Sequence, residues 1–192
     1  VNDPQDAASI SSSYVIDIYE DSLGYVWLGT EAGLNLFDVD AGTFRSFRSE
    51  RGNPKSLSSD LTWSLNEDDQ GRLWVGTQSG GVNYWPREAR KNLEVDFMTL
   101  PGSIKLPSLD VYAVVPDDLG YIWLSHNRGL SRLNPDLTFA QHFDVTDGLQ
   151  GSEFNHGAAY QDSDGFLYFG GNNGFNIVNP RVVVPSDYSP PL

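Results

Sequence analysis

Carboxylate pairs recur along the chain, and paired carboxylates can act as acid and base or bind Ca²⁺. The pair Asp162 and Asp164, followed by Gly165, resembles a calcium loop. It lacks the rest of the EF-hand pattern, including a Glu at loop position 12. A catalytic pair need not recur at regular intervals, so the recurrence favours structural turns, and we expect no metal. The acidic groups are Glu20-Asp21, Glu67-Asp68-Asp69, Asp117-Asp118 and Asp162-Ser163-Asp164.

Three histidines and one arginine could bind a ligand or move a proton. His142 lies in a loosely patterned segment and is expected at the surface. Arg128 follows His126, and a guanidinium can hold a carboxylate or uronate through two hydrogen bonds. The scattered histidines lack metal-ligand spacing, and for each candidate a plain surface or loop role is the alternative. The candidate ligand-binding residues are His126, Asn127, Arg128, Glu153, Asn155, His156, Asn172 and Asn173.

The sequence lacks the common catalytic and cofactor motifs. No G-x-S-x-G, Walker loop, H-E-x-x-H or dinucleotide fingerprint is present, and we expect no cofactor. The absence of cysteine excludes disulfides, thiol catalysis and thiolate metal sites. A net charge of −14 disfavours nucleic acids and anionic membrane surfaces as partners. The chain begins at Val1 and shows neither a signal peptide nor a membrane span, so we expect a piece of a longer protein.

The candidate residues are embedded in a fourfold repeat with a period of roughly 47 residues. Its copies cover residues 15–38, 62–85, 111–134 and 156–179. In each copy an aspartate precedes a glycine by three positions, an aromatic residue follows that glycine by three, and a second glycine comes later. The first three anchors are Asp21, Gly24 and Trp27; Asp68, Gly71 and Trp74; Asp117, Gly120 and Trp123; and Asp162, Gly165 and Tyr168.

Each copy has the pattern of short β-strands. The Asp-x-x-Gly element is typical of a turn, because the Asp side chain hydrogen-bonds to the nearby backbone and Gly adopts positive φ. The apolar runs that follow, such as residues 25–28, predict strands buried between two sheets. No helical period extends over 11 residues. A looser fourth strand is predicted at residues 43–47, 94–98, 138–143 and 182–184.

Four short antiparallel strands per repeat predict an all-β fold, a β-propeller of four blades that are each a four-stranded sheet. The repeated aromatic residues are expected to form the core between blades rather than a stacking platform. Residues 1–10 and 185–192 are predicted to be linkers. The blades are predicted within residues 11–184, at about 11–48, 58–99, 108–144 and 153–184.

The strand order places the candidate residues in space. If the first strand of each copy is innermost, the Asp-x-x-Gly turns lie at one end of the propeller, which we call the bottom. The loops after the repeated aromatic residues lie at the other end, the top, beside the segments that enter the innermost strands. A ligand site near the axis would use these top loops. An enzyme would need a non-repeated acid or base there, with Glu153, Asp110, Asp60 and His126 as candidates.

The string Asp-x-x-Gly-x-(aliphatic)-Trp-(Leu/Val)-Gly-Thr occurs from Asp21 and again from Asp68. It resembles the two-component regulator propeller repeat, and the resemblance covers most of the chain. That family forms the periplasmic sensor region of membrane-spanning bacterial regulators. The third copy departs from the pattern with Ser125-His126, and the fourth with Tyr168 and Gly170-Gly171.

The resemblance implies an extracytoplasmic sensor without enzymatic activity, which binds a ligand or partner and signals to a cytoplasmic histidine kinase or diguanylate cyclase. An oligosaccharide or another small polar ligand is the expected ligand class. Residues 147–158 and 173–180 look like the last blade of such a sensor, so we expect the C-terminal arc of a larger propeller. A closed ring, an arc completed by other blades, and an arc that self-associates remain open. The alternative function is a propeller-fold polysaccharide hydrolase or lyase.

Overall fold

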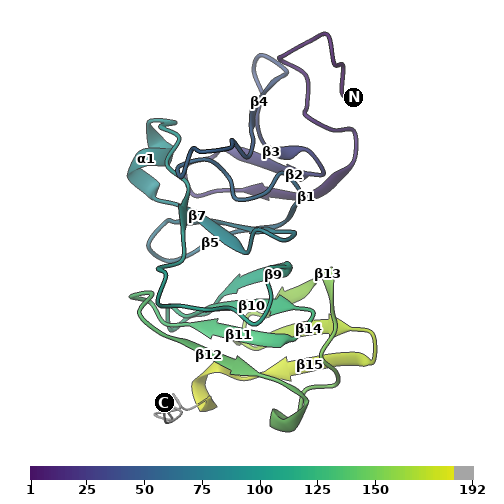
Figure 1. Ribbon diagram of the computed structural model, residues 1–192, viewed down its shortest axis with the longest axis vertical. Helices are drawn as coiled ribbons and strands as arrows, with labels where there is room; N and C mark the ends of the chain where they lie inside the picture. Colours follow the sequence, from purple (N-terminus) through teal and green to yellow (C-terminus); the bar gives the residue numbers. More distant parts are fainter. Residues whose placement is uncertain (184–192) are drawn as a thin grey trace.

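The computed structural model describes residues 1–183, which form four antiparallel sheets that follow one another along the chain (Figure 1). Within each sheet, or blade, the strands are hydrogen-bonded in chain order. Blades 1 and 2 contain β1 (Val15–Glu20), β2 (Val26–Thr30), β3 (Gly33–Asp38), β4 (Thr43–Phe47), β5 (Thr62–Glu67), β6 (Leu73–Thr77), β7 (Val82–Trp85) and β8 (Met98–Thr99). Blades 3 and 4 contain β9 (Val111–Pro116), β10 (Ile122–His126), β11 (Gly129–Leu133), β12 (Ala140–Phe143), β13 (Phe154–Gln161), β14 (Leu167–Gly171) and β15 (Gly174–Val178).

Three blades have the four strands that the sequence predicts, whereas blade 4 has three among the described residues. The predicted strand at residues 182–184 is wrong in its described part. Pro180–Val182 instead forms a 3-10 helix, η2, because Asn179 caps it by accepting a hydrogen bond from the Arg181 N–H. Residue 184 lies outside the described residues.

Short helices also interrupt the all-β pattern. Helix α1 (Arg87–Lys91) begins directly after Pro86, whose ring is suited to a helix start. It occupies much of the connection to β8, and only Met98 of the predicted strand at residues 94–98 belongs to a strand. A 3-10 turn, η1 (Val145–Asp147), is closed by a capping box between Asp144 and Asp147.

The aspartate of each Asp-x-x-Gly turn fixes both the turn and the repeated aromatic ring. In blade 1, Asp21 Oδ1 accepts the backbone N–H groups of Leu23 and Tyr25, and Oδ2 accepts the Trp27 Nε1–H at 2.8 Å. The recurrent aspartates of the turns therefore accept hydrogen bonds within their own blades. The equivalent carboxylate–ring bonds are Asp68–Trp74 at 2.6 Å, Asp117–Trp123 at 2.8 Å and Asp162–Tyr168 at 2.9 Å.

Each blade presents two different faces to its neighbours. In blades 1 to 3, the face with the repeated aromatic ring, which we call the tryptophan face, packs on the next blade. In blades 2 to 4, the opposite face, which we call the aliphatic face, packs on the preceding blade. Trp27 lies against Leu65, Leu73 and Trp85 of blade 2. Blades 2 and 3, and blades 3 and 4, are joined by equivalent clusters, so the repeated indoles form the core between blades.

The four blades form an open arc. Their innermost strands pack in series, β1 on β5, β5 on β9 and β9 on β13. Strand β13 also reaches β5, whereas β1 and β13 share no comparable packing in the described part of the chain. Figure 1 shows blades 1 and 2 as the upper pair and blades 3 and 4 as the lower pair. The aliphatic face of blade 1 and the tryptophan face of blade 4 therefore have no neighbouring blade in residues 1–183.

The segment before β1 packs on blade 1. The Phe44 N–H donates to the Ala8 carbonyl at 2.8 Å, and Ile10 is buried. The Ser11 N–H donates to Asn35 Oδ1 at 2.9 Å. Blade 2 contains the same bond, from Ser58 N–H to Asn83 Oδ1. The repeat interactions therefore begin within this segment, before the first strand.

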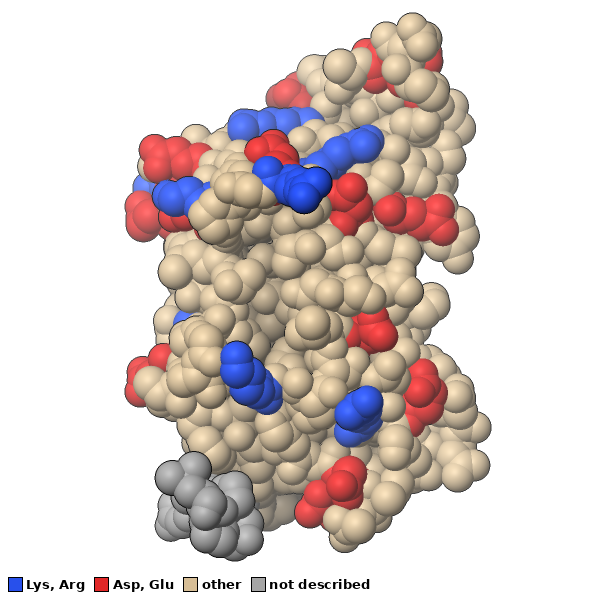
Figure 2. All heavy atoms as spheres, viewed as in Figure 1, with Lys and Arg blue, Asp and Glu red and all other residues tan. Residues whose placement is uncertain are grey.

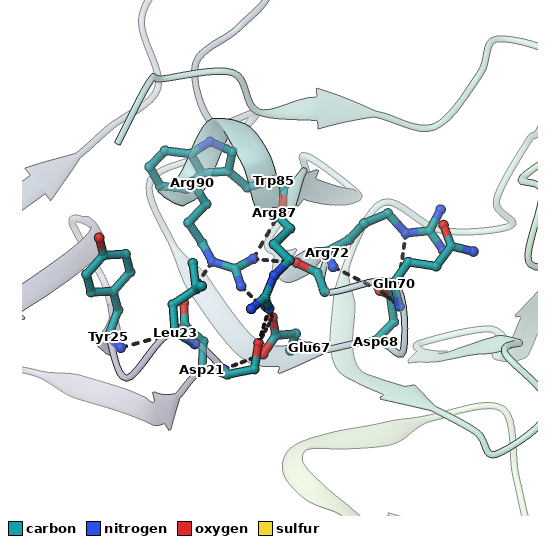
Figure 3. Close-up of polar contacts among 12 residues, drawn as sticks. Asp21, Leu23, Tyr25, Glu67, Asp68, Gln70, Arg72, Trp85, Arg87 and Arg90 are labelled. Carbon is teal, nitrogen blue, oxygen red and sulfur yellow. Dashed lines mark hydrogen bonds and ion pairs between the residues drawn. The ribbon is translucent and has the colours of Figure 1, made fainter. Parts of the chain in front are cut away.

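A buried arginine ties blade 1 to blade 2 at the bottom (Figure 3). Arg90 of α1 has no exposed surface, and its Nε lies 2.7 Å from Asp21 Oδ2 while its Nη2 pairs with Glu67. Its Nη1 donates to the Gly71 carbonyl at 2.9 Å. Arg87, which is more exposed, also reaches Glu67. Helix α1 thus positions one guanidinium against two carboxylates from different blades.

Charged side chains are unevenly distributed over the face shown in Figure 2. Acidic and basic groups gather over its upper part, and fewer lie across its middle. The whole chain has a net charge of −14. At long range this field repels anions and favours neutral or cationic partners.

Candidate ligand-binding site

Three aromatic side chains from consecutive blades meet at the propeller axis. The ring centroid of Trp63 on β5 lies 5.0 Å from that of Tyr112 on β9 and 6.1 Å from that of His156 on β13. The Trp63 and His156 planes are inclined by 14°. Trp63 and Tyr112 are half-buried, and His156 is exposed. We call these three residues the axial aromatic cluster, and its exposed rings can receive the apolar face of a ligand.

Bulges in the innermost strands supply the cluster. The pairing register shifts between Thr62 and Ser64, which leaves Trp63 without a partner on β6. The equivalent shift in blade 3 leaves out Tyr112. In blade 4 the shift is longer and includes His156. Because a bulge re-aims a side chain, three blades can direct a non-repeated residue to the same place.

Glu153 adds a charged acceptor beside the cluster. The Tyr112 hydroxyl donates to Glu153 Oε1 at 2.9 Å. Burial, followed by this hydrogen bond, raises the pKa of Tyr112 to about 12, so the phenol remains protonated at neutral pH. A carboxylate has more lone pairs than one donor can use. Glu153 can therefore accept a ligand hydroxyl while it holds Tyr112.

A cavity of about 290 Å³ lies between the innermost strands. Its lining includes Asp17 of β1, Trp63 of β5, Val114 of β9 and Gln161 of β13, so every blade contributes. The Asp17 carboxylate accepts the Leu65 N–H at 2.7 Å, and burial raises its pKa. Trp63 lines this cavity as well as belonging to the axial aromatic cluster. The volume is at the lower end of the range for small-ligand sites.

The candidate asparagines lie in the top loops. Asn127 Nδ2 donates to Asp110 Oδ2 at 3.3 Å, beside the start of β9. The Asn172 N–H donates to the Glu153 carbonyl at 3.3 Å, and Asn173 Nδ2 bonds to the backbone that precedes β13. These contacts fix the loops against the segments that enter the innermost strands. The side chains of Asn172 and Asn173 are exposed.

His126, in contrast, lies in the interior with no exposed surface. Its Nε2 is 2.7 Å from Ser131 Oγ, and its Nδ1 accepts the Arg128 N–H at 3.1 Å. The same position holds Thr30 in blade 1 and Thr77 in blade 2, and their hydroxyls donate to loop carbonyls. The expectation of a ligand-binding His126 is therefore corrected, because this histidine closes its loop and offers no surface to a ligand.

His126 should make folding sensitive to acid. Burial, with smaller effects of His142 and Arg128, lowers its pKa to about 4, against about 6.5 in an unfolded chain. Its contribution is complete above the unfolded pKa and is lost as the pH falls through the folded pKa. Between pH 7 and pH 4 we expect a loss of up to about 3 kcal/mol from this group. Urea unfolding at both pH values should show a smaller loss for His126→Thr, and identical losses would contradict this assignment.

The remaining acid–base candidates are separated from one another. Asp60 Oδ1 accepts the Ser49 N–H at 2.6 Å, and Asp110 Oδ1 accepts the Ser79 N–H at 2.8 Å. Both carboxylates thus fix loops. Glu153 is the candidate that hydrogen-bonds to the axial aromatic cluster. The side chains of Arg128 and Asn155 are exposed.

The suspected calcium loop is a turn of the repeat. Asp162 Oδ1 accepts the N–H groups of Asp164 and Phe166, while Oδ2 accepts the Tyr168 hydroxyl. Across residues 1–183, no group of three or more histidines or carboxylates is placed to hold a metal ion. The same residues include no helix with the length and apolar character needed to cross a membrane.

Comparison with known families accounts for the repeat. The model of the two-component regulator propeller matches residues 9–32 and 56–79, which contain the start of blades 1 and 2. The chain carries two-component regulator propeller repeats. Histidine kinase P4 of Formosa agariphila is 28% identical over 193 residues. The alignment covers 98% of this chain and 13% of that kinase, so the chain corresponds to a small part of such a protein.

Solved structures show the same propeller fold. An extracellular domain described as part of the hybrid two-component system BT4673 of B. thetaiotaomicron has a TM-score of 0.78 at 20% identity, covering 98% of this chain and 26% of that one. A virginiamycin B lyase from Staphylococcus aureus, crystallised with quinupristin, has a TM-score of 0.61 at 14% identity and covers 95% of this chain and 59% of the lyase. Propellers of this shape thus occur both in an extracellular domain of a two-component system and in a lyase, and the fold alone does not assign a function.

Sequence reasoning did not select Trp63 and Tyr112. Both stand one residue into an innermost strand, where the equivalent residue of blade 1 is Ile16. The sequence does contain a signal for these two residues, because each is an aromatic residue at a position where another copy has an aliphatic one. The direction of its side chain could not be predicted, because a bulge breaks the two-residue alternation of a strand.

Proposed function

We propose that the chain is the sensory propeller segment of a periplasmic signalling protein and binds a neutral oligosaccharide, or a similar small polar ligand, at the axial aromatic cluster. Trp63 is the observation that carries this proposal. It is half-buried at the axis, its ring stacks on His156, and it lines the cavity between the innermost strands. A pocket that combines aromatic surface with a few polar groups is the usual form of a small-ligand site.

The chemistry of the cluster suits a sugar. Trp63 and Tyr112 offer ring surface to the C–H face of a pyranose. Glu153 can accept hydrogen bonds from hydroxyl groups, and the exposed His156 can donate or accept them. The acidity of the chain disfavours anionic sugars, although Arg128 at the top could hold a single carboxylate.

A sensor must also transmit the binding event. The cluster takes its three rings from β5, β9 and β13, so a ligand that contacts all three bridges blades 2, 3 and 4. Such a ligand would favour one spacing of these blades if it binds that spacing more tightly than another. The resemblance to a histidine kinase and to extracellular domains of two-component systems supports a kinase output elsewhere in the protein.

Thermal unfolding in the presence of neutral oligosaccharides tests the proposal. A bound sugar should raise the melting temperature, and Trp63→Ala should weaken binding about 30-fold, since truncating a central aromatic anchor costs about 2 kcal/mol. Phe139→Ala, which removes a partly exposed aromatic ring on blade 3, is the matched control and should bind normally.

Analysis of the same mixtures for products separates binding from turnover. We expect the sugar to be recovered unchanged. Cleavage of the sugar would favour the hydrolase or lyase alternative, and equal binding by the wild type and Trp63→Ala would place the site elsewhere.

A further inference from the structure

We propose that the cavity between the innermost strands recognises an amino group through the Asp17 carboxylate. Of two oligosaccharides that differ only by an amine in place of a hydroxyl, the chain would then bind the aminated one more tightly. This specificity rests on the proposed function, because Trp63 belongs both to the axial aromatic cluster and to the wall of this cavity. Neutral sugars bind at the cluster, and an amine gains one further contact.

Asp17 is a charged residue at a position that is small and neutral in the next two blades. By its pairing with the second strand, Asp17 corresponds to Ser64 in blade 2 and to Ala113 in blade 3. Both of those residues are buried. The carboxylate is therefore an exception to the repeat, as Trp63 and Tyr112 are in the axial aromatic cluster.

The structural role of this position does not need a charge. Asp17 Oδ2 accepts the Leu65 N–H of blade 2 at 2.7 Å, which joins the two innermost strands. In blade 2 the hydroxyl oxygen of Ser64 accepts the equivalent Val114 N–H of blade 3 at 3.0 Å. A neutral side chain thus makes the same bond between blades. The charge of Asp17 is unfavourable for the fold, because burial disfavours the ionised form and raises the pKa of this carboxyl group.

No cation of the described chain offsets the charge of Asp17. None of the ion pairs within residues 1–183 includes this carboxylate, and the described lining of the cavity contains no Lys, Arg or His. Besides the Leu65 N–H, the carboxylate accepts the Ile18 N–H at 2.9 Å. The two oxygens of a carboxylate can accept about four hydrogen bonds. Asp17 therefore has both charge and lone pairs available for a cation in the cavity.

An ammonium group suits this environment better than a metal ion. A metal ion such as Ca²⁺ needs several oxygen ligands, and residues 1–183 contain no group of three or more histidines or carboxylates placed to hold one. An ammonium group needs fewer partners, because it can donate to a carboxylate and also be attracted to the face of a tryptophan ring. Trp63 lines the same cavity as Asp17. The net charge of −14 attracts the same class of ligand at long range.

An amino sugar would also contact more of the propeller than a neutral sugar. Asp17 lies on β1, whereas the rings of the axial aromatic cluster lie on β5, β9 and β13. A ligand held by the cluster and by Asp17 would therefore contact the innermost strand of every described blade. The amine extends the proposed bridge between blades 2, 3 and 4 to blade 1.

Titration calorimetry with matched pairs of sugars tests this specificity. The probes are β-1,4-linked tetramers of glucose and of glucosamine, and the corresponding tetramers of galactose and of galactosamine. Measurements at about pH 6 keep the amines protonated, and about 0.15 M salt screens the general attraction of an acidic chain. We expect the amino sugar of a pair to bind about 10-fold more tightly than its neutral counterpart, as one hydrogen bond to a charged group provides.

Two substitutions of Asp17 separate its charge from its structural role. Asp17→Ser introduces the residue of blade 2, and Asp17→Asn keeps the shape of the side chain. Both retain an oxygen for the Leu65 N–H, so circular dichroism should show both variants folded. In each variant the amino sugar should lose its advantage. Asp40→Asn removes an equal charge from an exposed loop of blade 1 and should keep the full preference.

The outcomes separate this specificity from the proposed function. Equal binding of a neutral sugar and its amino counterpart would overturn the specificity alone, as would a preference that survives both Asp17 variants or is lost in Asp40→Asn. Unfolding of both Asp17 variants would overturn it too, because the charge would then have a structural role. Binding of none of the four sugars would overturn the proposed function as well.

Discussion

Replacing Trp27 by alanine is expected to lower the free energy of unfolding by about 4 kcal/mol, the usual cost of truncating a buried tryptophan. Its side chain has no exposed surface and lies between Phe47 of its own blade and Trp85 of the next, at centroid distances of 5.9 and 5.5 Å. The substitution would also leave Asp21 Oδ2 without the indole N–H that it accepts. Both losses fall on the interface between blades 1 and 2.

The matched control is Trp63→Ala, which removes the same atoms from the half-buried tryptophan of the axial aromatic cluster. We expect it to cost less, about 2 kcal/mol, because part of that side chain already contacts water. Urea unfolding of both variants, followed by circular dichroism, measures the difference. Equal losses for the two variants would contradict the assignment of Trp27 to the core and of Trp63 to the axial site.

Replacing Arg90 by methionine is expected to cost about 3–5 kcal/mol, because it removes one partner from a buried ion-pair network. Arg90 has no exposed surface and is paired with Asp21 and Glu67 (Figure 3). Without the guanidinium, the buried Asp21 carboxylate would lose its ion pair, and Glu67 would keep only the more exposed Arg87 at 3.6 Å. The hydrophobic stem of methionine would fill the space and would not supply the lost charge.

Two further variants separate charge from packing at this site. Arg87→Met should cost less than about 1 kcal/mol, because the Arg87 side chain is 39% exposed and its ion pair is screened by water. Adding Glu67→Gln to Arg90→Met should recover part of the lost stability by removing a carboxylate that has lost its closest ion pair. A neutral Arg90→Met, or a double variant less stable than the single one, would contradict the electrostatic account.

The repeat made most of the fold predictable. Spacing between Asp21, Gly24 and Trp27 predicts the turn and the buried ring. It recurs with the same indole bond in blades 2 and 3 and with the Tyr168 hydroxyl as donor in blade 4. The number of blades and the order of strands follow from four such copies. Local turn chemistry and strand patterning agree in each copy, which is why the interpretation did not depend on any single segment.

The features that the sequence did not predict are those in which one copy differs from the others. Helix α1 is a five-residue segment, too short for a helical period, and its purpose becomes visible only when Arg90 is seen between two blades. His126 replaces a repeat threonine and was expected in a ligand site, but its imidazole fits the same loop-closing role from inside. The direction of the Trp63 side chain became evident only from the bulge of β5 in the structure.

The candidate site likewise contains residues that the sequence predicted and residues that it did not. The sequence selected Glu153 and His156 as candidate ligand-binding residues, and in the structure Glu153 contacts Tyr112 while His156 stacks on Trp63. The rings that join them come from β5 and β9, far away in sequence. Contacts between distant strands depend on the curvature of the arc, which no local pattern specifies.

Quenching of tryptophan fluorescence by acrylamide tests the central claim most directly, because the account leaves one accessible indole. Trp27, Trp74 and Trp85 have no exposed surface and Trp123 is 1% exposed, whereas Trp63 is only half-buried at the axis. We predict a single quenchable component that disappears in Trp63→Phe and is shielded by the oligosaccharide that raises the melting temperature. Quenching that persists in Trp63→Phe, or an accessible Trp63 at saturating oligosaccharide, would contradict a packed propeller with its ligand site at the axis.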